Sequence, residues 1–278
     1  MFESSLAVQR SGWIARITSV CAPTLHYWME TEVHVYAFSI AANVLLSFFP
    51  FLIVMISICR NILHWRAAEH AILSAVMDLF PGTVGEFVTR NLVANLSTSG
   101  PVNLMSLFLL FFTANGIFEP LEVALNRAWR IHKNRSWVMN QLVSLGLIFA
   151  VGALVLSSAA MTGNTGSYSR VFYRVLAVPV TVLVLFLVYW LLPNCRMPAM
   201  RVLPVAFAVG LALELLKYIN LLTLPWLWTK LEHEYGPFKN SVAIVLWSFL
   251  AAMIVLAGAD WSARSGLRVD ENRPDQEA

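Results

Sequence analysis

The chain has 278 residues, of which 58% are hydrophobic and 13% are charged, and its formal net charge is +3. A soluble domain of this length would carry about twice the share of charged residues, so the composition indicates a membrane protein. The small net charge, spread over scattered basic residues, argues against nucleic-acid binding. Its three cysteines lie far apart without a Cys-x-x-Cys pair, so neither a disulfide framework nor a zinc knuckle is indicated.

Residues 1–35 form a segment of mixed polarity ahead of the first apolar run. Within it, Trp13, Ile14 and Ile17 recur at helical spacing close to Arg16. This pattern predicts either a helix on the cytoplasmic membrane surface or a helix packed on the bundle. No removable signal peptide is expected, because a basic segment followed by an apolar segment and a cleavage site is missing.

Apolar runs long enough to cross a membrane recur along the chain, since roughly 20 helical residues span a hydrocarbon core of ~30 Å. The residues between the first two runs have helical apolar patterning but are too polar to cross, so they predict amphipathic helices outside the bilayer. We predict an all-α polytopic membrane protein whose transmembrane domain covers residues 36–262, with six transmembrane helices at about 36–59, 102–118, 141–161, 175–192, 202–222 and 241–260, extracytoplasmic amphipathic helices at about 67–98, and a disordered cytoplasmic tail at 263–278.

The distribution of Lys and Arg predicts the orientation. Basic residues are more numerous in the segments that share a side with both termini, and the positive-inside rule therefore places both termini in the cytoplasm. A basic run follows the second predicted span. It is most simply part of the positive-inside signal, but it could also bind anionic lipid headgroups. The run contains Arg127, Arg130, Lys133 and Arg135.

An acid and a base, Glu214 and Lys217, lie inside the fifth apolar run, in the sequence LALELLKYINLL. A charged side chain near the bilayer centre costs several kcal/mol, so such residues usually face a bundle interior or a wet cavity. Their spacing of three puts both on one helical face, where they can meet. They form either a structural ion pair that fixes helix register, or a pair facing a central cavity, where protonation of Glu214 or an exchange of partners accompanies transport.

A polar stripe runs along the first predicted span. Ser39, Asn43 and Ser47 follow each other at intervals of four, and Pro50, which removes a backbone donor, is expected to kink the helix nearby. The stripe either hydrogen-bonds a neighbouring helix or faces a polar path opposite Glu214.

Catalytic and metal-binding patterns are missing from the sequence. It has no His-x-His or HExxH pattern, no GxSxG and no P-loop, so no enzyme activity, cofactor, metal or direct use of ATP is indicated. His233 between Glu232 and Glu234 could bind a metal, although a solvated acidic turn is the simpler interpretation. Asp260, beside Trp261 at the end of the last span, is either an interfacial anchor or a helix-packing partner.

Several short motifs, in order along residues 30–263, resemble the YihY/BrkB family of bacterial inner-membrane proteins. They are the Ser-x-Phe-Pro pattern around Pro50, the sequence ALNRAW, a Leu-Pro-Asn element, LELLK around Glu214, YGPF with a later Trp, and GADWSA. The chain departs from the pattern at Ala42 and Asn43, where the family usually has tyrosines, and at Pro237, Asp260 and Ser262. The motif positions are Asn126, Arg127, Pro193, Asn194, Tyr235, Gly236, Trp247, Gly258 and Asp260, the last with a residue that departs from the family's usual one.

The resemblance implies a six-helix protein of the bacterial inner membrane. Members of this family have been linked to serum resistance and, in one branch, to export of a lipid A precursor. The family's older label, ribonuclease BN, has no support from the residues, because clustered metal ligands are missing. We therefore expect a transporter or flippase that contacts membrane lipids and moves a lipid-related or amphiphilic substrate without using ATP itself. The alternative is a non-transporting scaffold in envelope assembly.

Overall fold

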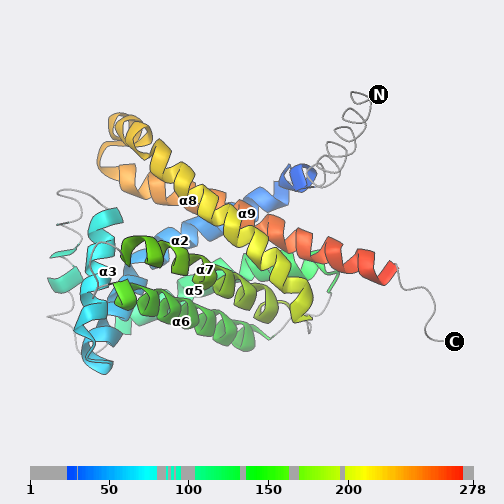
Figure 1. The fold of residues 1–278 in the computed structure, drawn as a ribbon, viewed down its shortest axis with the longest axis horizontal. Helices are drawn as coiled ribbons and strands as arrows, with labels where there is room; N and C mark the ends of the chain where they lie inside the picture. Colours follow the sequence, from blue (N-terminus) through cyan, green and yellow to red (C-terminus); the bar gives the residue numbers. More distant parts are fainter. Residues whose placement is uncertain are drawn as a thin grey trace.

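The computed structural model describes residues 24–29, 31–79, 86, 89–90, 92–94, 104–131, 136–162, 169–194 and 198–271. Every secondary-structure element in these ranges is a helix (Figure 1), which confirms the all-helical fold class. The long helices are α2 (Thr31–Ser57), α5 (Leu104–Ala128), α6 (Trp137–Thr162), α7 (Ser169–Leu191), α8 (Ala199–Tyr235) and α9 (Lys239–Glu271).

Each of these long helices coincides with one of the predicted spans. Within the described residues, four stretches are long and apolar enough to cross a membrane, and two further apolar helices are shorter. The protein is therefore a helical membrane protein, while the count of six spans stays a prediction. The four stretches are Glu32–Ile62, Leu104–Ala128, Ala199–Asn220 and Pro225–Arg264, and the shorter helices are Val138–Gly152 and Val178–Leu191.

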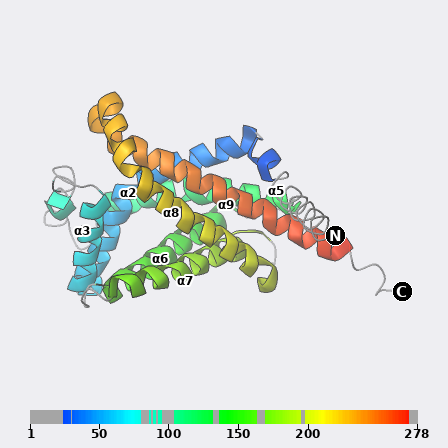
Figure 2. The same cartoon turned by 45° about the horizontal axis from the view of Figure 1, so that its top comes forward.

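The helices pack as a bundle in which α2 and α9 contact α5, and α9 also contacts α2 and α8 (Figures 1 and 2). Helices α6 and α7 lie side by side; α6 contacts α5 and α3, and α7 contacts α8. The largest fully buried side chains of the shared core include Tyr189, Leu110, Leu125 and Leu256. Because lipid is as apolar as these side chains, close packing and hydrogen bonds between helices must supply much of the association.

The end of α2 leads into a π-helical turn, η1 (Ile58–Ile62), in which Leu63 donates its N–H to the carbonyl of Ile58 at 2.9 Å. Helix α3 (Arg66–Leu79) follows, and its buried Ile72 and Val76 lie one turn apart, as the amphipathic pattern predicts. They pack in a second apolar cluster with Cys59 of η1. Most of the second predicted amphipathic helix, at 83–98, falls outside the described residues, as does the predicted helix before residue 24.

Helices α8 and α9 are longer than the spans predicted for them, with 37 and 33 residues. α8 begins at Ala199, so Pro204 lies in its second turn, and the helix continues past residue 222 to Tyr235 with Pro225 inside it. Pro225 does not end α8, because the Leu, Lys and Glu that follow it are strong helix formers. α9 likewise continues through residues 263–271, which the sequence assigns to the tail. The paired ends form a hairpin at the same end of the bundle as α3, separated from it (Figures 1 and 2).

Gly116 of α5 allows α2 to approach closely. A Cβ atom at this position would collide with the side-chain amide of Asn43, which lies against the glycine. The same amide donates a hydrogen bond to the carbonyl of Ser39 at 2.9 Å, so a residue of its own helix fixes its position. A larger residue at position 116 must therefore displace a side chain that is already hydrogen-bonded.

We expect Gly116→Val to lower the thermal unfolding midpoint of the purified protein in detergent, at a cost of about 1–3 kcal/mol, because it overpacks the α2–α5 contact. The combination with Asn43→Ala should cost less than the sum of the two single changes, since it vacates the colliding group. Gly146→Val in α6 is the matched control, because no atom lies within 4 Å of a Cβ built there. Equal shifts for the two glycine variants would contradict this account.

Candidate functional site

Glu214 and Lys217 form an ion pair on α8, with 2.6 Å between the Lys Nζ and the Glu Oε1. The hydroxyl of Thr181 on α7 donates to the same carboxylate oxygen at 3.4 Å. The two charged side chains differ in exposure, since 13% of the Glu214 side chain is exposed and 59% of Lys217 is. The carboxylate thus lies in the contact between α7 and α8, whereas the ammonium reaches the outside of the bundle.

Apolar side chains are exposed on α8 near Lys217 in the sequence. They are Leu215, Tyr218 and Leu222, and Lys217 itself lies within the membrane-spanning stretch Ala199–Asn220. A lysine at such a place can extend its methylene stem along the apolar surface toward a polar group. Most of the Lys217 side chain is therefore exposed in the described structure, while it is paired to a carboxylate that is nearly buried.

The polar stripe of α2 makes its hydrogen bonds within its own helix. Asn43 donates to the carbonyl of Ser39, and the Ser47 hydroxyl donates to the carbonyl of Val44 at 3.1 Å. Pro50 is buried further along the same helix. The contact of Asn43 with Gly116 points the stripe toward α5. In the described part of the chain, no hydrogen bond or ion pair joins the stripe to Glu214, and its role as a polar path stays a prediction.

Two motif asparagines from distant parts of the sequence meet at one end of the bundle. The buried Asn126 of α5 accepts the backbone N–H of Asn194 with its Oδ1 at 3.0 Å. Its Nδ2 donates to the Glu122 carboxylate, one turn earlier, at 3.4 Å. Asn194 follows Pro193 directly after α7, so this hydrogen bond fixes the end of α7 to α5.

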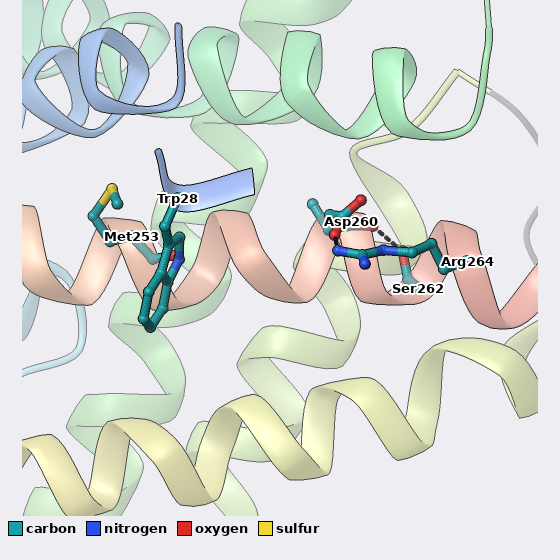
Figure 3. A network of polar contacts seen from close by, with 6 residues as sticks. Trp28, Met253, Asp260, Ser262 and Arg264 are labelled. Carbon is teal, nitrogen blue, oxygen red and sulfur yellow. Dashed lines mark hydrogen bonds and ion pairs between the residues drawn. The ribbon is translucent and has the colours of Figure 1, made fainter. Parts of the chain in front are cut away.

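A second contact ties the end of α5 to α9. The indole N–H of Trp129 donates to the Ser262 hydroxyl at 3.0 Å, and that hydroxyl donates to the carbonyl of Ala259 at 2.7 Å. Asp260, one of the two residues between Ala259 and Ser262, forms an ion pair with Arg264 (Figure 3). The motifs ALNRAW and GADWSA are therefore neighbours in the fold.

Two more aromatic residues bond the backbone of α9. The Trp28 indole N–H donates to the carbonyl of Met253 at 3.0 Å (Figure 3), and the Tyr189 hydroxyl of α7 donates to the carbonyl of Val255 at 2.7 Å. The motif residue Gly258 provides the space for Tyr189, because a Cβ at that position would collide with the Tyr189 hydroxyl. This glycine therefore leaves room on α9 for the Tyr189 hydroxyl of α7 and for the Val209 side chain of α8.

The basic run predicted to bind headgroups is described only in its first half. Arg127 forms an ion pair with Glu32 at the start of α2, and both side chains are largely exposed. Arg130 adopts a positive φ of 55° just after α5. Lys133 and Arg135 lie outside the described residues. An exposed pair such as Arg127–Glu32 contributes little stability, so it can exchange partners readily.

The remaining motif positions lie around the hairpin. Tyr235 ends α8, and Gly236, with a φ of 49°, opens the 3-10 turn η2 (Gly236–Phe238) that reverses the chain into α9. Such a positive φ favours glycine. Trp247 lies in α9, two turns after this reversal.

Within the described ranges, no group of three or more His, Cys, Asp and Glu residues could hold a metal ion.

Several residues that complete these contacts are missed by sequence reasoning. Thr181, Tyr189 and Trp28 lie in or beside apolar runs and read there as ordinary lipid-facing or core residues. Glu122 was visible as a charge, but its partner Asn126 could not be assigned from spacing alone. The sequence shows only that a hydrogen-bond donor lies in the middle of an apolar run. It does not show which residue of a neighbouring helix accepts the hydrogen bond.

We expect Asn126→Leu to destabilise the protein by about 1–3 kcal/mol, because it leaves the Asn194 N–H without its acceptor. Hydrogen–deuterium exchange should show faster exchange of the Asn194 amide together with a lower unfolding midpoint. Asn140→Leu in α6 is the control, since the side-chain oxygen of Asn140 accepts no hydrogen bond in the described structure. Unchanged protection of Asn194 in the Asn126 variant would disprove the assigned contact.

Comparison with known proteins identifies the family. The family model described as "Virulence factor BrkB" matches residues 24–278. A "UPF0761 membrane protein" of Acinetobacter baylyi is 29% identical over 177 residues, which cover 59% of this chain and 42% of that protein. A second protein of that name, from Chlorobium chlorochromatii, is 25% identical over 84% of this chain and 56% of its own length.

A third relative, the UPF0761 membrane protein of Pseudoalteromonas translucida, is 22% identical over 92% of this chain and 86% of its own length. The chain thus spans about half the length of the first two relatives and most of the third. No solved structure matches it. The resemblance carried by the sequence motifs is confirmed, and the chain belongs to the virulence factor BrkB family of membrane proteins.

Proposed function

We propose that this protein is a transporter or flippase that moves a lipid-related or other amphiphilic substrate across the bacterial inner membrane, with both of its termini in the cytoplasm. The observation that carries the proposal is the ion pair of Glu214 with the largely exposed Lys217 in a membrane-spanning stretch. The proposal includes neither a catalysed reaction nor ATP hydrolysis by this chain, since its sequence carries no catalytic motif and no P-loop.

The exposure of Lys217 supports a lipid-related substrate. Placing a charged side chain in hydrocarbon costs at least ~2.5 kcal/mol. Such a residue is therefore expected to have either a permanent partner of opposite charge or a function that requires the charge. Glu214 alone could neutralise the lysine, but a structural ion pair at low dielectric is favourable only when further hydrogen bonds satisfy its remaining protons and lone pairs. Here most of the Lys217 side chain is exposed. An anionic headgroup that approaches from the membrane can therefore reach Lys217.

The arrangement also offers an exchange of partners. When an anionic group takes Lys217, the Glu214 carboxylate keeps the hydrogen bond from Thr181 and remains at the α7–α8 contact. The headgroup of an amphiphile thereby gains a polar partner midway across the hydrocarbon, where it otherwise has none. A polar partner at this depth lowers the free-energy barrier for the headgroup to cross the hydrocarbon core. The apolar part of the substrate remains in lipid.

The hydrogen bonds at the end of the bundle that contains Asn126 support a model in which this end stays fixed while α8 moves. Asn126–Asn194 and Trp129–Ser262 join α5 to the end of α7 and to α9. Helix α8 begins only a few residues after Asn194, at Ala199. We propose that α8 and its ion pair move against α7 while this end remains joined.

Purified protein in liposomes that contain a fluorescently labelled phosphatidylglycerol should move the probe between leaflets faster than protein-free liposomes do. Glu214→Gln and Lys217→Met should each slow this movement by about tenfold or more, equivalent to ~1.4 kcal/mol of barrier. Loss of the probe's fluorescence to a membrane-impermeant reductant measures the rate.

The matched controls are Glu234→Gln and Lys230→Met, which remove charges that are exposed on the hairpin end of α8. They should leave the rate unchanged. A wild-type rate equal to that of empty liposomes would overturn the transport proposal. Wild-type rates in folded Glu214→Gln and Lys217→Met variants would overturn the role of the pair.

A further inference from the structure

An apolar groove of about 520 Å³ lies between α2 and α9. Phe38 and Leu45 line it from α2, and Val242, Val245 and Phe249 line it from α9. Its volume falls within the range of ligand pockets, roughly 300–1,000 Å³. Ser241 is the one polar residue among those that line it, so the groove suits a hydrocarbon rather than a polar ligand.

The groove forms where the two helices separate. At one end the rings of Phe38 and Phe249 pack with their centroids 4.3 Å apart, and beyond them Trp28 bonds the carbonyl of Met253. At the other end Phe238 of η2 lines the groove. Figures 1 and 2 show the α8–α9 hairpin diverging from the α3 end of α2. The Phe38–Phe249 pair therefore closes the end of the groove nearer the middle of α9, and the other end of the groove lies at the α8–α9 hairpin.

Its length matches one leaflet of a bilayer. The eleven-residue step from Phe238 to Phe249 corresponds to roughly 16 Å along a helix, and half of the hydrocarbon core is roughly 15 Å. The lining residues Phe38, Phe238 and Leu246 are exposed, so the groove opens to the outside of the bundle, where hydrocarbon surrounds a membrane protein. A single lipid chain can enter from the side and lie along it.

A cation stands at the hairpin end of the groove. Lys239 follows the lining residue Phe238, and its Nζ lies 2.9 Å from the Glu232 carboxylate and 5.6 Å from the centre of the Trp228 ring. The Glu232 side chain is 65% exposed, whereas the Lys239 side chain is only 17% exposed. An anionic group can approach the pair from the exposed side of Glu232 and replace it as the partner of Lys239, while the Trp228 ring keeps the ammonium in place.

We propose that this groove binds one acyl chain of an anionic phospholipid, with the lipid headgroup at Lys239. An acyl chain and an anionic headgroup together match both the apolar lining and the terminal cation, which an apolar helix of another protein does not. The inference rests on the proposed function only where it makes the bound lipid the amphiphile that is transported.

The test uses the full chain in phosphatidylethanolamine liposomes that contain a small fraction of phosphatidylglycerol with a photoreactive diazirine on its acyl chain. After irradiation, mass spectrometry of peptides should place the label on the groove segments 38–45 and 238–249. Val242→Trp should reduce this labelling at least fivefold by filling the groove. Val35→Trp, the same change at an exposed valine of α2, should leave it unchanged.

The headgroup contact is tested by a second variant that leaves the apolar lining intact. Lys239→Gln should reduce groove labelling by the phosphatidylglycerol probe but not by a phosphatidylethanolamine probe with the same chain. Groove labelling no stronger than labelling of the exposed α8 face at Leu215 and Leu222, or labelling that persists in Val242→Trp, would overturn the groove. Equal effects of Lys239→Gln on both probes would overturn the headgroup contact.

Labelling at equilibrium does not require transport, so the two proposals can fail separately. A labelled groove in a protein that moves no lipid leaves the binding site standing and overturns the proposed function. Wild-type transport in a Val242→Trp protein that has lost its label shows that the bound lipid is not the transported one. Transport that falls in proportion to labelling supports both proposals.

Discussion

Hydrogen bonds from aromatic and amide side chains to neighbouring helices hold this bundle together. Helix α9 receives three of them, from Trp28, from Tyr189 and, through Ser262, from Trp129. Surrounding lipid gives apolar helices little reason to prefer each other over lipid, so contacts of this kind decide which faces meet. Gly258 and Gly116 serve the same end, because each removes the side chain that would keep two helices apart.

The polar residues of this chain fall into two groups with different surroundings. Those at the Asn126 end are buried and bonded across helices, which is how polar groups become compatible with a dry interior. Glu214 and Lys217 instead lie within a spanning stretch, and one of them is open to the outside. Asn126 and Trp129 each join two helices, and Glu214 also does so through Thr181, whereas Lys217 is largely exposed and pairs only within its own helix in the described contacts. The functional proposals therefore begin from that pair.

Much of the fold could be predicted from the sequence, because apolar runs of sufficient length are visible without any knowledge of contacts. The centres of α2, α5 and α9 fall within predicted spans, and Glu214 and Lys217 meet as their spacing predicts. Helix ends were harder to place. Pro225 and the charges after it indicate a stop, yet α8 continues, since local helix propensity and packing on α9 together outweigh one missing backbone donor.

The contacts between motifs could not be predicted, because residue spacing carries no information about which helices are neighbours. Asn126 and Asn194 are 68 positions apart, and Trp129 and Ser262 are 133 apart. The motifs could be recognised from the sequence, but their convergence at one end of the bundle required the fold. The groove was missed for a related reason: Phe38, Val242 and Phe249 each read as lipid-facing residues when considered alone.

The 37 residues of α8 have a further mechanical consequence. At ~1.5 Å per residue the helix is about 55 Å long, well beyond a hydrocarbon core of ~30 Å. The helix carries the Glu214–Lys217 pair at its middle and the hairpin at its far end. The centre of the membrane and the region beyond its hydrocarbon are thus joined by one continuous helix, in which Pro225 lies between the ion pair and the hairpin.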